Sequence, residues 1–242
     1  MHGLRLNDGT EHIDGGLPVA RAAVGVSRTI PMVMGAGGDP VAAGLVESFA
    51  RPGGNLTGFT LMTQELSAKR VDLMRAAFPD ATAITALLNP NIVFGARETQ
   101  EAARSVGLTV TPIEVATPEA LRTLRPEALG KPGRPLLVVS DAMFWKHRRE
   151  IIALAAAAGV PALYPEREYA DDGGLMAYGP SVPDNFRRAA GYVDRILRGE
   201  KPGELPIQEP VKFDFVVNLK TAKELGITMP PLILGRADEV IE

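Results

Sequence analysis

Short apolar runs alternate with amphipathic stretches along this chain of 242 residues. The apolar runs predict strands near 31–35, 56–60, 82–88, 108–114, 135–140, 160–164, 174–178 and 212–217. The stretches between them predict helices near 18–28, 40–50, 64–78, 95–106, 117–127, 146–158, 183–198 and 219–225. The runs 84–88 and 136–139 lack the polar alternation of a half-exposed strand, so we expect central strands there. The alternation of strands and helices is typical of parallel sheets sandwiched by helices.

The most compact set of signals lies between the first two predicted strands. Three glycines follow the first strand, Asp39 can cap the next helix, and Pro40 occupies the first helical position. The helix predicted at 40–50 would then end before Pro52. Such a glycine-rich strand exit is either an ordinary turn or a loop that binds polar or anionic groups, and the sequence leaves both interpretations open.

The amino-acid sequence of this segment resembles a signature of a bacterial family, GGDPV followed by LxRPGGNxTG. The family comprises ABC-transporter substrate-binding proteins related to tryptophan- and tyrosine-binding uptake proteins. Further similar segments follow in the same order, at 66–70, 88–91, 173–179, 213–223 and 236–242. The resemblance runs from about residue 15 to the end. It implies an α/β fold of the periplasmic-binding-protein type I, with two three-layer lobes and mainly parallel sheets.

The resemblance also implies a division into lobes. We expect 15–79 with about 179–210 to form a partial N-terminal lobe, and 80–178 with about 211–242 to form the C-terminal lobe. Residues 1–14 are polar, lack the apolar core of a secretion signal and resemble nothing in the family. Family members normally open with a signal and the first elements of the N-terminal lobe, so we expect that lobe to be incomplete. An incomplete lobe leaves a sheet edge, from which we expect self-association or weak solute binding.

The composition of the chain excludes several classes of function. The net charge is −3, so bulk charge gives no reason to bind nucleic acid or an anionic membrane. The chain has no cysteine and three histidines, which excludes thiolate metal sites and leaves little for a histidine site. No apolar run approaches the length of a bilayer span. The sequence contains no nucleophile elbow, Walker loop or His-Glu-x-x-His motif, so we expect no enzyme, no metal and no cofactor.

Polar residues follow several predicted strands, at the edge where open parallel sheets bind ligands. Asp141 is the first candidate: its carboxylate could pair with a ligand ammonium, or could cap the next helix. Ser140 precedes it. Glu166 could reach a ligand amine or guide lobe closure, or could belong to a solvated run of charges. Asn89 could orient a ligand or form a turn, and Tyr178 offers a ring and a hydroxyl as a pocket wall.

Four further residues complete the candidate set. Phe144 and Trp145 are adjacent to Asp141, and either ring could close over a flat ligand or pack in the core. Asp39 could contact the ligand or act only as a cap. Thr60 ends the second predicted strand and is included with them. By its family resemblance Asp141 corresponds to the place where an acidic or hydroxyl group meets the polar head of the ligand.

Three functions from different classes remain open. The resemblance implies a solute-binding component that captures a small organic solute in a cleft between lobes. The family suggests an aromatic amino acid or aromatic acid as the solute, and a branched or aliphatic acid would fit almost as well. The partner of such a component would be an ABC permease, and the full-length protein would be periplasmic or envelope-associated. A ligand-sensing regulatory domain of the same fold is one alternative. A small α/β enzyme with a pocket carboxylate as acid or base is the other, and it requires a carboxylate with a perturbed pKa.

Overall fold

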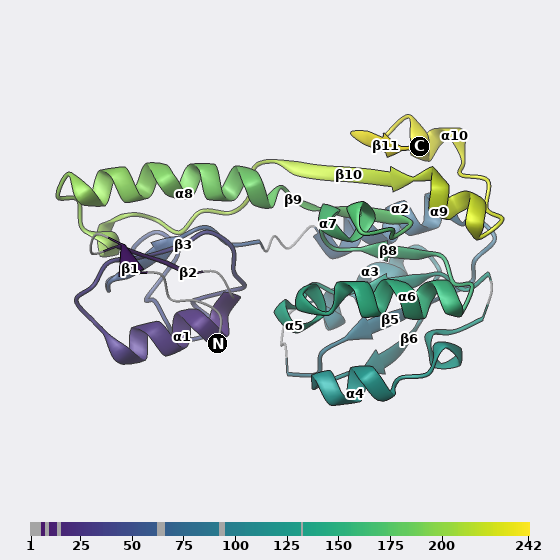
Figure 1. The fold of residues 1–242 in the computed structure, drawn as a ribbon, viewed down its shortest axis with the longest axis horizontal. Coiled ribbons are helices and arrows are strands. Elements are labelled where there is room, and N and C mark those ends of the chain that lie inside the picture. Colours follow the sequence, from purple (N-terminus) through teal and green to yellow (C-terminus); the bar gives the residue numbers. More distant parts are fainter. Residues whose placement is uncertain (1–5, 8–9, 14–15, 62–65, 92–94, 132) are drawn as a thin grey trace. The chain divides into compact units, whose positions relative to one another are not determined.

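The computed structural model describes residues 6–7, 10–13, 16–61, 66–91, 95–131 and 133–242. The chain forms two compact units (Figure 1). Unit 1 comprises Met1–Thr63 and Pro180–Lys212, and unit 2 comprises Gln64–Gly179 and Phe213–Glu242. The chain therefore passes from one unit to the other three times.

Unit 2 is built on a sheet of seven strands in the order β11-β10-β9-β8-β7-β5-β6 among the described residues. The strands are β5 (Ala83–Leu88), β6 (Thr109–Glu114), β7 (Leu136–Val138), β8 (Ala162–Tyr164), β9 (Met176–Pro180), β10 (Phe213–Asn218) and β11 (Glu239–Ile241). β5 pairs in parallel with both β6 and β7, and β8 pairs in parallel with both β7 and β9. β5 and β7 are flanked on both sides, which confirms the prediction of central strands at these two runs.

Successive residues of the unit 2 strands point into two separate cores, because side chains alternate across a sheet. Leu137 and Leu163 belong to one core, whereas Leu136 and Tyr164 belong to the other. Helices cover both faces of the sheet. The first core is covered by α2 (Leu66–Ala77), α3 (Ala96–Ser105), α9 (Leu219–Glu224) and α10 (Pro231–Leu234). The second core is covered by α4 (Pro118–Thr123), α5 (Ala142–Lys146), α6 (Arg148–Ala157) and α7 (Arg167–Asp171). A 3₁₀ turn, η1 (Pro126–Leu129), follows α4. Unit 2 is thus a three-layer α/β unit, as predicted.

Unit 1 is smaller. Its described strands β1 (Leu6–Asn7), β2 (Thr10–Ile13), β3 (Met32–Met34) and β4 (Leu56–Gly58) form one sheet in chain order. Helix α1 (Gly16–Val26) covers one face, and α8 (Val182–Leu197) covers the other. A 3₁₀ turn, η2 (Pro202–Glu204), follows α8, and Thr57 Oγ1 donates to the Leu205 carbonyl 2.7 Å away. β2 pairs in parallel with β3, so residues 10–13, which were expected to resemble nothing in the family, take part in the sheet of unit 1.

One predicted helix is wrong. Residues 40–50 form turns and bends instead of a helix. Asp39 does cap the expected turn, since its Oδ1 accepts from the N–H groups of Val41 and Ala42, each 2.9 Å away. Gly44 then adopts a φ of 67°, in the left-handed region, which ends the helical hydrogen bonding after one turn.

The division between units also differs from the expected lobes at one place. Residues 64–79 were expected in the first lobe, but they belong to unit 2. The reason is the apolar face of α2: Leu73, Met74 and Ala77 are buried in the same core as Ile84 and Leu163. The short helices α5, α7 and α10 and the strands β1, β2 and β11 were not predicted from the sequence.

A close approach of two strand ends requires glycine at residue 179. A Cβ atom there would overlap the Pro165 carbonyl oxygen and would press on the Arg70 guanidinium. We therefore expect Gly179→Ala to destabilise unit 2 by about 3 kcal/mol, as overpacking of a backbone contact does. Gly191→Ala is the matched control, because Gly191 lies in α8 with no atom near its Cβ position, and we expect it to stabilise by up to about 1 kcal/mol. Urea denaturation followed by circular dichroism measures both, and equal stability of the two variants would contradict this account.

Candidate functional site

Three neighbouring parallel strands of unit 2 end at polar residues. Asn89 follows β5, Ser140 and Asp141 follow β7, and Glu166 follows β8. Because the carboxyl ends of parallel strands meet at one edge of the sheet, these four residues come together. We call them the exit cluster.

Side-chain hydrogen bonds join the exit cluster in two pairs. Asn89 Nδ2 donates to Asp141 Oδ2 over 3.1 Å, and Ser140 Oγ donates to Glu166 Oε1 over 2.6 Å. The other carboxylate oxygen of Asp141 accepts from the Phe144 N–H, 3.0 Å away, and so caps α5. Asp141 is therefore both a helix cap and part of the exit cluster, and its contact with a ligand stays a prediction.

Glu166 is the most unusual member of the exit cluster. Only 3% of it is exposed, and Oε2 is buried without a hydrogen bond to any described residue. Burial raises the pKa of Glu166 from 4.5 to about 7, while the Ser140 hydrogen bond and the charge of Arg70 act against that shift. The Glu166 carboxyl is consequently divided between its neutral and charged forms near neutral pH.

Arg70 lies beside these strand ends and was not among the candidates from the sequence. It is 6% exposed; Nε donates to the Tyr178 carbonyl over 2.9 Å and Nη2 to the Pro165 carbonyl over 3.0 Å. Burial lowers the pKa of Arg70, and the nearby Glu166 opposes this. Arg70 ties α2 to the ends of β8 and β9. A sequence signal existed, since Arg70 shares a helical face with Leu66, Leu73 and Ala77.

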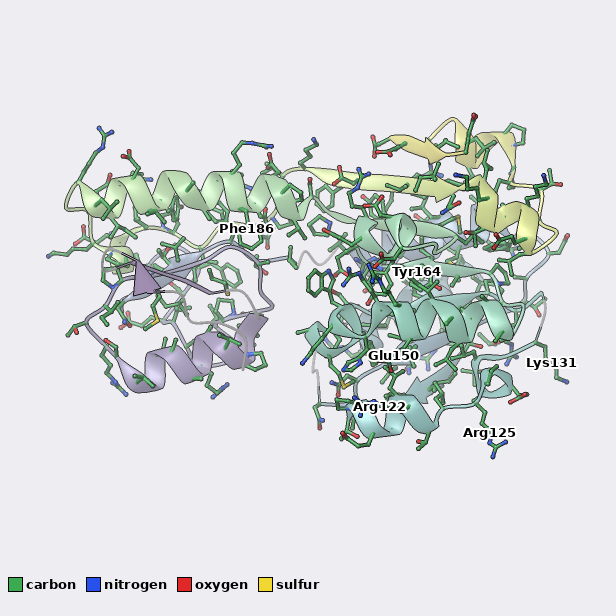
Figure 2. All side chains as sticks on the ribbon, in the orientation of Figure 1. Arg122, Arg125, Lys131, Glu150, Tyr164 and Phe186 are labelled. Carbon is green, nitrogen blue, oxygen red and sulfur yellow. The ribbon has the colours of Figure 1, made fainter. Side chains whose placement is uncertain are left out.

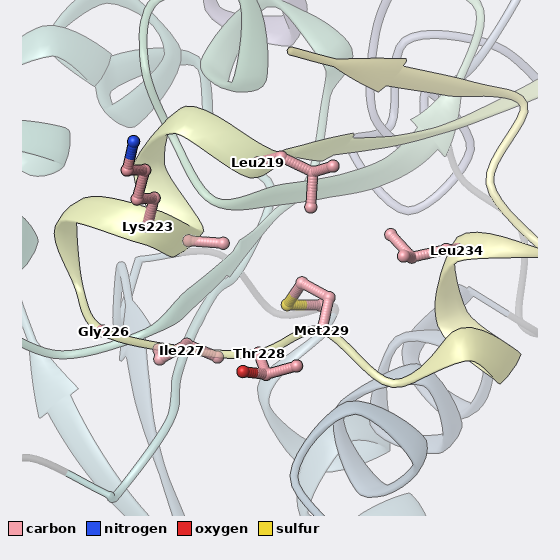
Figure 3. Close-up of a pocket in the computed structure, with 8 residues that line it drawn as sticks. Leu219, Lys223, Gly226, Ile227, Thr228, Met229 and Leu234 are labelled. Atoms are coloured by element: carbon pink, nitrogen blue, oxygen red, sulfur yellow. The ribbon is translucent and has the colours of Figure 1, made fainter.

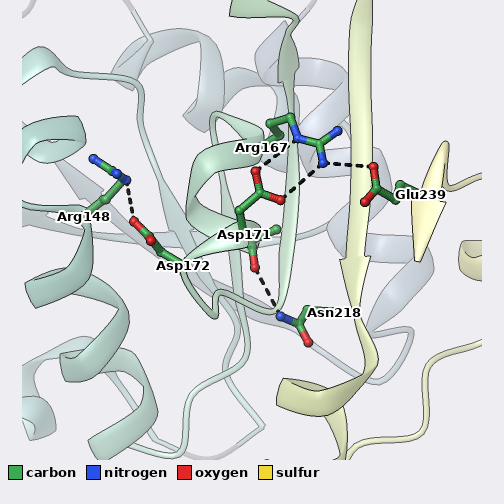
Figure 4. A network of polar contacts seen from close by, with 7 residues as sticks. Arg148, Arg167, Asp171, Asp172, Asn218 and Glu239 are labelled. Carbon is green, nitrogen blue, oxygen red and sulfur yellow. Dashed lines mark hydrogen bonds and ion pairs between the residues drawn. The ribbon is translucent and has the colours of Figure 1, made fainter. Parts of the chain in front are cut away.

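Helix α7 begins directly after Glu166 and is held by a polar network (Figure 4). Arg167 binds Asp171 within α7 and reaches Glu239 of β11 at 2.9 Å. Asn218, at the end of β10, donates to the Ala170 carbonyl over 3.1 Å. Arg148 of α6 pairs with Asp172 at 2.8 Å. These contacts fix the turn that carries Glu166 against three other elements.

The aromatic candidates of unit 2 lie in different surroundings. Phe144 is fully buried in the second core, so its ring packs there as the core alternative predicted. Trp145 is 42% exposed, and the Arg148 guanidinium lies 4.8 Å from its ring centroid. Tyr178 is half-buried and stacks on Phe213 with centroids 6.1 Å apart. Tyr164, labelled in Figure 2, stacks on Tyr169 inside the unit and was not a candidate.

Asp39 and Thr60 belong to unit 1. Asp39 is half-buried and caps the turn described above. Thr60 is fully buried, and its Oγ1 lies 3.1 Å from the carbonyl oxygens of both Gly37 and Gly38. Asn185 of α8 also donates to the Thr60 carbonyl over 3.0 Å. Both residues thus shape the glycine-rich strand exit of unit 1, and their contact with a ligand stays a prediction.

A separate cavity of about 430 Å³ lies beside α9 and α10 (Figure 3). Its lining is mainly apolar and comes from the segment 219–234. No member of the exit cluster contributes to it. The cavity and the exit cluster are therefore separate features of unit 2.

The described part of the chain lacks two further features. It contains no group of three or more His, Asp or Glu residues arranged to hold a metal ion. Among its helices, none is long and apolar enough to cross a membrane.

Comparisons with known proteins place this chain in a family. Residues 11–241 match the family described as ABC transporter substrate binding protein. A tyrosine-binding protein of Clostridioides difficile (strain R20291) is 25% identical over 214 residues, which cover 87% of this chain and 61% of that protein. The chain thus spans less than two thirds of the relative's length.

Two solved structures are similar throughout most of the chain. A conserved domain protein of Vibrio cholerae has a TM-score of 0.84 and 26% identity, with 92% of this chain and 75% of that chain covered. An ABC domain of Streptococcus pneumoniae in complex with L-Trp has a TM-score of 0.80 and 25% identity, with 93% and 78% covered. The chain belongs to the family of ABC transporter substrate binding proteins.

The raised pKa of Glu166 has a cost in stability. Its carboxyl loses its proton near pH 7 when folded but near pH 4.5 when unfolded, so the free energy of unfolding falls as the pH rises through that window. Glu166→Gln removes the titration and keeps an acceptor for Ser140. We expect the variant to gain about 3 kcal/mol relative to wild type between pH 4.5 and pH 8.

Urea denaturation followed by the fluorescence of Trp145, the single tryptophan and a residue of unit 2, measures this gain. Glu127→Gln, at an exposed carboxylate, is the control and should follow wild type at every pH. A constant difference between Glu166→Gln and wild type from pH 4.5 to pH 8 would show that Glu166 titrates normally.

Proposed function

We propose that this chain is the solute-binding component of an ABC uptake transporter and binds an aromatic amino acid, which it releases unchanged. The observation that carries the proposal is the exit cluster: four polar side chains at the carboxyl edge of a parallel sheet, in a member of a substrate-binding family. The relatives whose descriptions mention tyrosine and L-Trp support an aromatic amino acid as the solute. The partner would be an ABC permease, and the protein would act outside the cytoplasm.

The chemistry of the exit cluster suits the polar head of an amino acid. Asp141 supplies a half-buried carboxylate that can pair with an ammonium, and Asn89 and Ser140 supply neutral hydrogen-bonding groups beside it. Asn89 already orients the Asp141 carboxylate, so little rearrangement is needed when the ammonium arrives. Such preorganisation raises affinity by reducing the entropic cost of binding.

An enzyme would also call for a carboxylate with a raised pKa, and Glu166 has one. Binding is the better account because the chain belongs to a family of substrate-binding proteins. Recovery of the solute after prolonged incubation distinguishes the two functions. We expect mass spectrometry to return L-tryptophan and L-tyrosine unchanged, whereas an enzyme would yield product.

Asp141→Asn tests the role of charge in the exit cluster. Asparagine caps a helix as well as aspartate does, so the variant keeps the cap of α5. It removes the negative charge and also the acceptor for Asn89 Nδ2, because the new amide nitrogen can only donate. We expect isothermal titration calorimetry to show L-tryptophan or L-tyrosine binding to wild type and at least about tenfold weaker binding to the variant. Asp80→Asn, at an exposed residue of unit 2, should bind as wild type does. Equal affinity of Asp141→Asn and wild type would remove Asp141 from the site.

A further inference from the structure

The exit cluster has an outer and an inner part. Asn89, Ser140 and Asp141 are half-buried, so they can meet a solute at the end of the sheet. Glu166 is enclosed behind them, and the 2.6 Å hydrogen bond from Ser140 connects it to the outer part. An enclosed carboxyl with one oxygen lacking a hydrogen bond to the described residues is costly, and a purely structural role does not account for it.

We propose that solute capture at the exit cluster releases the proton of Glu166, so that binding of an amino acid is linked to pH. The inference rests on the proposed function, because it takes a solute with a free ammonium as the occupant. It adds a role for Glu166 that does not require direct contact: the buried carboxyl responds to the charge that arrives in front of it.

The charges around Glu166 explain the direction of the response. In the empty protein, burial and the negative charges of Glu168 and Asp141 favour the proton on Glu166. An ammonium that pairs with Asp141 places a positive charge close to Glu166 and offsets that of Asp141. A positive charge near a carboxyl lowers its pKa, so Glu166 shifts towards its ionised form as the solute binds.

The other groups that face Glu166 come from two helices and do not replace it as the titrating group. Arg70 of α2 acts against its proton, and Tyr169 of α7 has a pKa raised well above its usual value by burial. Glu168, also of α7, adds negative charge. His147 bonds Glu150 at 2.9 Å and is not among the groups whose charges act on Glu166. His147 therefore provides the control for any pH dependence.

The test is titration calorimetry of the whole chain with L-tryptophan at pH 6, 7 and 8, in phosphate and in Tris, whose ionisation enthalpies differ. We expect release of about half a proton per bound solute at pH 7 and about tenfold tighter binding at pH 8 than at pH 6. Indole-3-propionate has the same ring and carboxylate but no ammonium. We expect it to bind without releasing a proton and with no gain in affinity at higher pH.

Three variants separate the proton link from a structural role. Glu166→Gln should remove both the proton release and the pH dependence, whatever its affinity. Ser140→Ala removes a hydrogen bond that lowers the pKa of Glu166, so its pH midpoint should move upward. His147→Gln should keep the proton release and the pH dependence of wild type.

The outcomes for the inference and for the proposed function differ. L-tryptophan binding that is equally tight at pH 6 and pH 8, with no proton release, overturns the inference and leaves the proposed function in place. Proton release that survives in Glu166→Gln also overturns it. If neither L-tryptophan nor L-tyrosine binds at any pH, the proposed function fails, and the inference fails with it.

Discussion

The parallel pairing of β5, β7 and β8 is the constraint on which the candidate site depends. Parallel strands end at the same edge of a sheet, so the residues that follow them must meet there. Residues 52 and 26 positions apart along the chain, Asn89 with Asp141 and Ser140 with Glu166, become hydrogen-bonded partners for this reason. No local property of these segments brings them together.

The same edge shows how the protein balances stability against a functional arrangement. Interior packing would favour an apolar residue at position 166, because a buried carboxyl with an unmade hydrogen bond opposes folding. The surroundings compensate for part of this cost. Arg70 fixes the ends of β8 and β9 through their carbonyl groups, and the network around Arg167 fixes α7. A rigid frame of this kind keeps Glu166 close to Ser140 although burial disfavours its charge.

The sequence predicted eight strands, and all eight are present. Most of them are short apolar runs bounded by turn residues, whereas β6 alternates polar and apolar residues at the edge of its sheet. Seven of the eight predicted helices are also present. The failure at 40–50 has a clear cause: Asp39 and Pro40 are good signals for a helix start, but a single residue, Gly44, ends the turn. The candidates chosen from the sequence included every member of the exit cluster but not Arg70. A charged residue is normally expected on the exposed face of a helix, whereas Arg70 lies on the buried face of α2.

The sequence by itself determined the α/β class, the family and the set of polar residues that follow the strands, since these depend on local periodicity and on motifs. The tertiary structure decided which of those residues are partners and which is buried. Asp141 and Glu166 are both carboxylic acids that follow buried parallel strands, yet Asp141 is half-exposed and caps a helix, whereas Glu166 is enclosed and burial raises its pKa to about 7. That difference arises from the elements that pack around each carboxyl, and burial of this kind depends on contacts between segments far apart in the chain.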